Sequence, residues 1–278
     1  MERIATVKKT SEILSSFSFF MKKNYGQNFL ISPNVPSYIA EHSNIDKETL
    51  VIEIGPGVGA LTQFLLEKAK KVICYEIDKD LIPILKEVLK EYDNLEVINR
   101  DILKVDLVKE IKFNEYKNVV IASNLPYYIT SEILIKLFKI DYPFTIVAMM
   151  QKEVAKRILK SDGGKDENEL TLCSKYFTDY KLLKEVSKND FFPRPKIDST
   201  VLIFKKKENV LNGVDFINFI NVLYEQRRKT IWNNLKGLFE TKEEMEIYLE
   251  KLQIEKATRV EELSFETITK MFIEYIQR

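Results

Sequence analysis

Residues 51–64 read VIEIGPGVGALTQF, and residues 122–130 read ASNLPYYIT. The first stretch predicts a buried strand, a tight glycine turn and the start of a helix, because glycines allow positive φ and let a ligand approach the backbone closely. The second stretch places Asn, Leu, Pro and two aromatic residues directly after another apolar strand. Together the two stretches predict a nucleotide-like cofactor beside a site that binds a planar amine.

Short apolar runs rich in Val and Ile alternate with helical patterns around these two stretches. The expected strands are 50–54, 72–77, 95–99, 118–123 and 144–150, and the expected helices are 60–69, 79–91 and 130–140. Strands and helices in alternation are typical of an α/β protein with a parallel, doubly wound sheet. Two further extended runs, 181–186 and 199–207, are expected to form an antiparallel pair at a sheet edge.

The β pattern stops after Lys207. Residues 214–239 and 242–276 carry apolar residues at helical spacing and predict amphipathic helices. A chain of 278 residues is long enough for one large and one small core. We therefore expect a doubly wound domain with an N-terminal arm over 1–207 and a small all-helical domain over 208–278.

Composition narrows the classes of function. The chain has 43 Lys and Arg against 42 Asp and Glu, so its net charge gives no argument for a polyanionic partner. An excess of Lys and Arg in 152–207 and in the N-terminal arm nevertheless leaves room for a basic face. The single histidine, His42, argues against a poly-histidine zinc site, and we expect no metal.

Cysteine usage and hydropathy bear on the setting of the protein. Cys74 and Cys173 are far apart and match no metal or redox spacing, which indicates a reduced, cytoplasmic environment. No apolar run approaches the length that spans a membrane, so we expect no membrane association.

The glycine turn 55–59 has the spacing GxGxG and not the GxGxxG of dinucleotide folds. Glu53 stands just before it, where a carboxylate disfavours a pyrophosphate and favours a cationic amino-acid group. Glu76, at the end of the second strand, is placed to accept hydrogen bonds from both ribose hydroxyls. Asp101, after the third strand, is placed to accept from an adenine amine. A tight turn without a ligand explains the glycines alone, but the acidic residues favour S-adenosylmethionine.

The segment 124–128, Asn-Leu-Pro-Tyr-Tyr, predicts how an amine is bound. An exocyclic amine of adenine is a poor nucleophile, because its lone pair is delocalised into the ring. The Asn124 side-chain oxygen and a backbone carbonyl can accept both amine hydrogens and aim the lone pair at a methyl group. Pro126 stiffens the turn, and Tyr127 offers a flat face to an extruded base. The alternative is a strand-ending turn whose tyrosines belong to the core.

Four more stretches complete a resemblance to a known family. They are KKNYGQNFL at 22–30, MQKEVA at 150–155, FFPRPKIDS at 191–199 and RRKT at 227–230. In this order, and with the glycine turn and the Asn-Leu-Pro-Tyr segment, they resemble the ribosomal RNA adenine N6,N6-dimethyltransferase family over essentially the whole chain. The resemblance implies a Rossmann-like, S-adenosylmethionine-dependent methyltransferase domain followed by a small helical domain.

The resemblance also implies the reaction and its partner. The enzyme would transfer methyl groups to two adjacent adenosines in a hairpin near the 3′ end of small-subunit (16S) rRNA in a pre-ribosomal particle, and we expect a monomer. The implied cofactor-binding residues are Gln27, Asn28, Leu30, Gly55, Gly57, Glu76, Ile77, Asp101, Ile102 and Asn124. The implied catalytic residues are Asn124, Leu125, Pro126, Tyr127 and Phe191. Phe191 would stack on the flipped adenine opposite Tyr127. The expected RNA-binding residues are Lys152, Arg194, Lys196 and the cluster Arg227, Arg228 and Lys229, which we place on one amphipathic helix.

Other classes of function remain as alternatives. The large-subunit (23S) rRNA adenine methyltransferase of the macrolide-resistance type shares the fold, the cofactor and the Asn-aromatic segment. Tyr128 in place of His, the pair Asp198-Ser199 and the long helical C-terminal region favour the small-subunit enzyme. A non-enzymatic RNA-binding factor is disfavoured by Glu76 and Asn124. A small-molecule or protein methyltransferase would not need basic flanks or a clamp for a planar base.

Three positions depart from the family pattern. Tyr25 precedes GQNFL where Leu or Phe is usual, 168–171 reads NELT where Gly-x-Leu-Ser is common, and Trp232 stands where a smaller or basic residue is common. The cofactor residues are untouched, so these changes concern the RNA-facing side.

Overall fold

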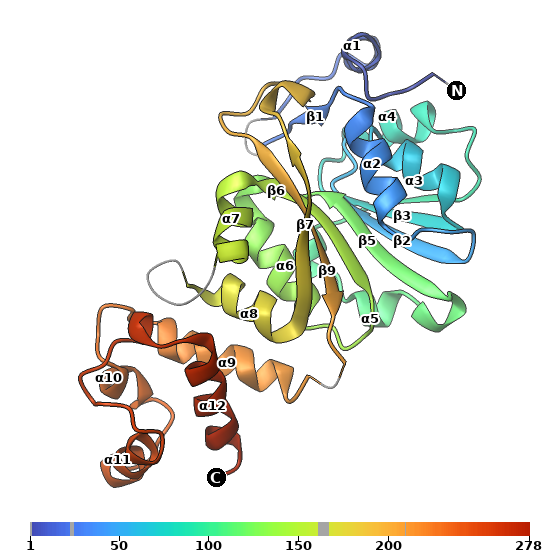
Figure 1. The fold of residues 1–278 in the computed structure, drawn as a ribbon. Helices are drawn as coiled ribbons and strands as arrows, with labels where there is room; N and C mark the ends of the chain where they lie inside the picture. The colour runs from blue at the N-terminus through green and yellow to red at the C-terminus, as the bar shows by residue number, and fades with distance from the viewer. Residues whose placement is uncertain (1, 23–24, 161–166, 209) are drawn as a thin grey trace. The chain divides into compact units, whose positions relative to one another are not determined.

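The computed structural model describes residues 2–22, 25–160, 167–208 and 210–278 (Figure 1). The chain divides into two compact units. The sheet unit comprises Met1–Ala155 and Asp179–Lys206, and the helical unit comprises Lys156–Thr178 and Lys207–Arg278. The segment 156–178 thus groups with the C-terminal region, whereas the sequence pattern alone assigns it to the larger domain.

A seven-stranded sheet with the order β4-β3-β2-β5-β6-β9-β7 forms the centre of the sheet unit. Its strands are β2 (Thr49–Ile54), β3 (Lys71–Glu76), β4 (Leu95–Asn99), β5 (Asn118–Asn124), β6 (Thr145–Gln151), β7 (Thr178–Val186) and β9 (Ser199–Lys206). The five strands from β4 to β6 run parallel, which confirms the doubly wound α/β fold. β7 and β9 are neighbours at one edge, and β9 inserts between β7 and β6, antiparallel to β6.

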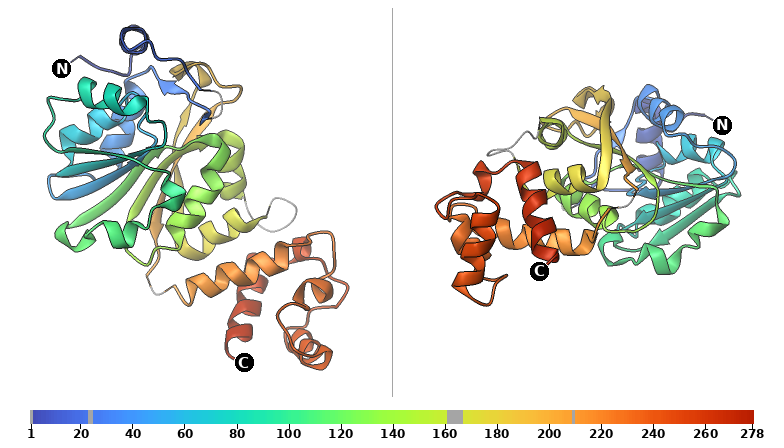
Figure 2. Two further views of the ribbon diagram at one scale, coloured as in Figure 1. Left: turned by 180° about the vertical axis from the view of Figure 1, so that it is seen from behind. Right: turned by 60° about the horizontal axis from the view of Figure 1, so that its bottom comes forward.

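Helices cover both faces of this sheet, with α2, α3 and α4 on one side and α6 on the other (Figures 1 and 2). The helices that begin in this unit are α1 (Val7–Ser16), α2 (Asn34–His42), α3 (Thr62–Lys68), α4 (Leu81–Val88), α5 (Leu107–Glu110), α6 (Thr130–Phe138) and α7 (Lys152–Lys160). Because both faces are covered, all six residues of β2 are buried. Glu53 is therefore a carboxyl group inside the core of the sheet.

A second, two-stranded sheet fixes the N-terminal arm. β1 (Phe29–Leu30) pairs antiparallel with β8 (Phe191–Phe192), with Phe29 opposite Phe192 and Leu30 opposite Phe191. Phe29 and Leu30 are buried in the same hydrophobic core as α2, α3 and α4. The arm is thereby held next to the glycine turn that follows β2.

The helical unit contains α8 (Glu169–Phe177), α9 (Gly213–Tyr224), α10 (Ile231–Leu235), α11 (Lys242–Lys251) and α12 (Phe265–Ile276). The expectation of two long helices over 214–239 and 242–276 is wrong, because the chain turns after Tyr224 and again after Lys251. Gln253 adopts a left-handed φ of 56°, and the Ser264 hydroxyl caps α12 by accepting from the Thr267 amide. The apolar periodicity continues across the turns because each short helix buries the same face in one core.

Aromatic rings dominate that core. Phe216 stacks on Tyr176 with ring centroids 3.7 Å apart and meets Phe272 edge-on at 5.3 Å. The ring of Phe177 occupies the space beside Gly213, where a Cβ would lie 2.5 Å from it. None of the helices in the described part of the chain combines the length and the hydropathy needed to cross a bilayer.

Candidate active site and cofactor pocket

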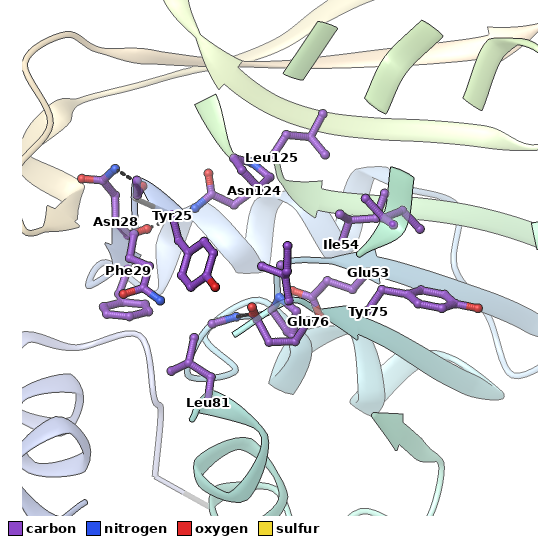
Figure 3. Close-up of a pocket in the computed structure, with 18 of the residues that line it drawn as sticks. Tyr25, Asn28, Phe29, Glu53, Ile54, Tyr75, Glu76, Leu81, Asn124 and Leu125 are labelled. Atoms are coloured by element: carbon purple, nitrogen blue, oxygen red, sulfur yellow. Dashed lines mark hydrogen bonds between the residues drawn. The ribbon is translucent and has the colours of Figure 1, made fainter. Parts of the chain in front are cut away.

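A pocket opens at the carboxyl ends of β2, β3 and β5 (Figure 3). Its wall is made by the N-terminal arm, the glycine turn, the end of β3, the loop after β4 and the loop after β5. All ten predicted cofactor-binding residues line it: Gln27, Asn28, Leu30, Gly55, Gly57, Glu76, Ile77, Asp101, Ile102 and Asn124. Of the predicted catalytic residues, Asn124, Leu125, Pro126 and Tyr127 line it as well.

The glycine turn presents bare backbone to this pocket. Gly55 and Gly57 have φ values of 67° and 60°, which residues with a Cβ adopt at a cost. A Cβ on Gly57 would also lie 3.0 Å from ring atoms of Phe29. Both the positive φ values and the nearby Phe29 ring therefore favour glycine in this turn. Its bare backbone allows a small ligand to approach closely.

Glu76 closes the pocket at the end of β3. Its side chain is 5% exposed, and its two oxygens accept hydrogen bonds from the Asp78 amide at 2.8 Å and the Gly57 amide at 3.3 Å. Burial raises the pKa of Glu76 to about 7 despite these bonds. A buried carboxyl group held next to the glycine turn is well placed to receive hydroxyl donors from a ligand.

Gln27 joins the arm to the end of β3. Its side chain accepts from the Lys22 amide at 2.8 Å and donates to the Asp78 carboxylate at 2.8 Å. The Lys22 ammonium pairs with the same buried Asp78 and with Asp80, at 2.6 Å for the latter. Both aspartates raise the pKa of Lys22. Sequence reasoning missed Lys22 and Asp78, because ordinary charged residues far apart in the chain give no local signal.

The Asn124 side chain uses its amide nitrogen as a donor, while its amide oxygen has no partner among the described residues. Its Nδ2 donates to the Asn28 carbonyl at 3.2 Å, which fixes the orientation of the amide. Its Oδ1 is buried and has no hydrogen-bond partner in the part of the chain that the structure describes. A buried acceptor without a partner costs free energy, so this oxygen is prepared for a donor that enters with a ligand.

The two tyrosines after Pro126 differ in their surroundings. The Tyr127 hydroxyl hydrogen-bonds the Ser199 hydroxyl of β9 at 2.7 Å, and burial raises the pKa of Tyr127. This bond holds the ring of Tyr127 in the pocket wall. Tyr128 is 49% exposed and stands opposite Gly26 of the arm.

Phe191, which the resemblance implies as a stacking partner of the adenine, is buried in this structure. It is 2% exposed, belongs to the hydrophobic core and is absent from the described pocket wall. Successive residues of a strand face opposite sides, and the pairing with β1 turns Phe191 inward. The stacking of Phe191 on a flipped adenine therefore stays a prediction. Its neighbour Phe192 is 39% exposed and is the aromatic residue of this motif that solvent reaches.

The predicted RNA-binding residues fall into two groups. Arg194, Lys196, Arg228 and Lys229 are exposed, and Lys152 pairs with Glu185 at 3.0 Å. Arg227 is only partly exposed and donates to the Glu167 carbonyl at 2.9 Å. The placement of Arg227, Arg228 and Lys229 on one amphipathic helix is wrong, because α9 ends at Tyr224 and the three residues follow in a turn.

The structure also shows where the residues that depart from the family pattern lie. Asn168 and Thr171 form a capping box at the start of α8, so a polar residue replaces glycine there for a structural reason. Trp232 lies in α10 under the Lys256 ammonium, 4.7 Å from the ring centroid. Tyr25 points into the pocket between Asn124 and Glu76 (Figure 3). Nowhere in the described ranges do three or more His, Cys, Asp or Glu side chains gather as metal ligands would.

Comparisons with known proteins agree with this geometry. The model of the family "Ribosomal RNA adenine dimethylase" matches residues 18–277. The ribosomal RNA small subunit methyltransferase A of Bacillus pumilus is 42% identical over 96% of this chain and 96% of its own. The protein of the same name from Staphylococcus haemolyticus is 40% identical over 99% of this chain and 97% of its own.

Solved structures extend the likeness to three dimensions. A dimethyladenosine transferase from Plasmodium falciparum has a TM-score of 0.73 and 28% identity, and the match covers 89% of this chain and 97% of that one. The 23S rRNA methyltransferase ErmE has a TM-score of 0.65 and 24% identity over 90% of this chain, which shows a shared fold. The family match spans nearly the whole sequence, and the pocket combines a glycine turn, buried acids and a buried acceptor that has no partner among the described residues. This chain belongs to the ribosomal RNA adenine dimethylase family and is a methyltransferase that uses S-adenosylmethionine.

Proposed function

We propose that this enzyme dimethylates N6 of two adjacent adenosines in a hairpin near the 3′ end of 16S rRNA. It acts as a monomer on a pre-ribosomal particle in the cytoplasm. The observation that carries the chemistry is the buried Asn124 Oδ1, which lacks a hydrogen-bond partner among the described residues and lies in the same pocket as the glycine turn. The choice of target rests on relatives about 40% identical that are named small-subunit methyltransferases.

The residues that hold the cofactor follow from the pocket wall. Gly55 and Gly57 bring the backbone close to the amino-acid portion, Glu76 accepts from the ribose hydroxyls, and Asp101 accepts from the adenine amine. Gln27 holds the arm over the pocket through its bonds to Lys22 and Asp78. When bound, S-adenosylmethionine supplies a methyl group on a positively charged sulfur.

Asn124 and one backbone carbonyl prepare the target amine. The Asn124 Oδ1 accepts one amine hydrogen. The Pro126 carbonyl already accepts from the Thr130 hydroxyl at 2.9 Å, so the Leu125 carbonyl is the better acceptor for the second hydrogen. With both hydrogens held, the nitrogen lone pair points away from the ring plane. The amine nitrogen would form a bond to the methyl carbon as the S–CH3 bond breaks, the sulfur would keep that electron pair, and the acidic ammonium product would lose a proton to solvent without a dedicated base.

RNA contacts separate into selection and positioning. Tyr127, held by Ser199, stacks on the extruded adenine, and the exposed residues Arg194, Lys196, Arg228 and Lys229 contact phosphates. Arg227 differs from these residues in that its Nη2 donates to the Glu167 carbonyl, which ties part of its guanidinium to the fold. The 23S rRNA methyltransferase shares the fold, but at 24% identity that likeness does not extend to its target.

The target is tested on ribosomal subunits that lack the modification. Incubation of such small subunits with the protein and S-adenosylmethionine should yield two adjacent N6,N6-dimethyladenosines near the 3′ end of 16S rRNA. Mass mapping of nuclease fragments locates them, and unmodified large subunits are the matched control. Methylation of 23S rRNA in place of 16S rRNA would replace this proposal with the alternative.

Replacement of Glu76 by Ala should weaken binding of S-adenosylmethionine at least tenfold. A hydrogen bond to a charged group contributes roughly 1.5–3 kcal/mol, and each 1.4 kcal/mol is about a factor of ten in affinity. Titration calorimetry measures the change, and Glu96→Ala on the neighbouring strand β4, where the side chain is exposed, is the control. An unchanged affinity in Glu76→Ala would remove Glu76 from the cofactor site.

Replacement of Asn124 by Ala should lower the rate of transfer by on the order of a hundredfold or more, as removal of one preorganised polar group at a reacting centre does. RNA affinity should stay near that of the wild type, because the lost bonds form with the amine that reacts. Single-turnover rates at saturating RNA and cofactor measure the effect. Asn118→Ala, at the exposed opposite end of β5, is the control. A rate near that of the wild type would show that Asn124 is not the acceptor.

Replacement of Arg228 and Lys229 together by Ala should flatten the salt dependence of RNA binding. Each phosphate contact that is lost reduces the slope of log K against log salt by about one unit. The matched control removes two other exposed cations, Lys109 and Lys112 of the sheet unit. RNA affinity measured over a salt series should give a shallower line only for the first double variant. Equal slopes for this double variant and the wild type would show that Arg228 and Lys229 do not contact phosphates.

A further inference from the structure

Asp78 is a buried carboxylate just past the end of β3, and it is absent from the described pocket wall. Its Oδ2 accepts from Gln27 Nε2 at 2.8 Å. Its Oδ1 accepts from the Asp80 amide at 3.1 Å and pairs with the Lys22 ammonium. A charge inside a protein is costly unless it is paired and hydrogen-bonded, and these contacts meet that requirement. Asp78 therefore joins the N-terminal arm to the sheet.

Gln27 is bonded to the protein at both polar ends of its side chain. Its Oε1 accepts from the Lys22 amide at 2.8 Å, while its Nε2 donates to Asp78. The Lys22 ammonium in turn reaches Asp78 and Asp80. Two residues of the arm are thus bonded to each other and to the same buried carboxylate, which fixes the backbone at Gln27.

Asn28, the next residue of the arm, extends this set of contacts to Asn124. The Asn28 carbonyl accepts from Asn124 Nδ2 at 3.2 Å (Figure 3). Asn28 lies between two anchors, because Gln27 precedes it and strand β1, which pairs with β8, follows it. Loss of the anchor at Gln27 would leave the Asn28 carbonyl fixed from one side only.

The Asn28 carbonyl decides which end of the Asn124 amide enters the pocket. A carbonyl oxygen only accepts, so it bonds the amide nitrogen and turns the amide oxygen away from itself. A half-turn of the amide would present an NH2 group to the pocket, and an NH2 group cannot accept a hydrogen from an incoming amine. The Asn124 Oδ1, which is buried without a partner in the described ranges, thus depends on the arm for its orientation.

We propose that Asp78 is a positioning residue for methyl transfer, which acts on Asn124 through the N-terminal arm. Asp78 holds Gln27, and the adjoining Asn28 carbonyl turns the Asn124 oxygen toward the target amine. This inference rests on the proposed role of Asn124 as an acceptor for that amine. Loosening the arm removes an interaction with the reacting group, so its effect belongs in the rate of transfer.

The variant Asp78→Asn tests this role, because it keeps the size of the side chain and removes the charge that pairs with Lys22. The rate of a single turnover on unmodified small subunits, at saturating RNA and cofactor, should fall by about tenfold, since misplacement of a group by about 1 Å can cost about a hundredfold. In an Asn124→Ala background the same change should lower the rate no further, because the group that Asp78 positions is gone.

A second variant keeps the test valid if Asp78→Asn does not fold. Lys22→Met removes the partly exposed cation of the arm and leaves the buried carboxylate and Gln27 in place. It should lower the rate by a smaller factor and should also have no effect in the Asn124→Ala background. Lys117→Met, which breaks an exposed ion pair with Glu48 of 2.7 Å, is the matched control and should transfer at the rate of the wild type.

The outcomes separate this inference from the proposed function. A rate near that of the wild type in a folded Asp78→Asn, or in Lys22→Met if Asp78→Asn does not fold, overturns the positioning role. An equal loss of rate with and without the Asn124 side chain overturns it as well, while Asn124 remains the acceptor. If Asn124→Ala alone transfers at the rate of the wild type, Asn124 is not the acceptor, and both proposals fail.

Discussion

Parallel strands end at a common edge, and this constraint decides where the glycine turn, Glu76 and Asn124 lie. Because β2, β3 and β5 run in the same direction, the residues that follow them meet although they are far apart in the chain. The glycine turn, Glu76 and Asn124 each occupy the first positions after or at the end of a strand. The pocket is thus a property of the sheet topology, and the side chains supply its chemistry.

Three carboxyl groups at the pocket end of the sheet are shielded from solvent. Glu53, Glu76 and Asp78 are all buried at the same edge of the sheet, yet their surroundings differ. Asp78 is paired with Lys22 and bonded by Gln27, so its charge serves to hold the arm. Glu76 is bonded by backbone amides, and Glu53 has a thiol beside it. Three acids in one place therefore have three different sets of partners: a cation with a side-chain amide, two backbone amides, and a thiol.

The sequence predicts best what depends on local pattern. Runs of Val and Ile reveal the five parallel strands, and the residues after them reveal the pocket. The insertion of β9 between β6 and β7 depends on pairing between distant segments, which leaves no local trace. Whether Phe191 or Phe192 faces inward depends on the register with β1, and two adjacent aromatic residues give the pattern no basis for a choice.

The same limit applies in the helical unit. Amphipathic periodicity runs through the turns after Tyr224 and Lys251, because all the short helices bury one face. Arg227 resembles its neighbours in composition, but its hydrogen bond goes to Glu167, sixty residues earlier in the chain. A basic run therefore does not reveal which of its members is committed to the fold and which faces solvent.

The free oxygen of Asn124 has a consequence for when the reaction stops. In the proposed mechanism, an unmodified adenine amine offers two hydrogens to the Asn124 Oδ1 and the Leu125 carbonyl. After one transfer a single hydrogen remains, so the base still donates a hydrogen bond to one of the two acceptors. After the second transfer none remains, and the doubly methylated base leaves both acceptors without a donor. Under this mechanism the doubly methylated base is bound more weakly than its precursors, because it donates no hydrogen bond to either acceptor.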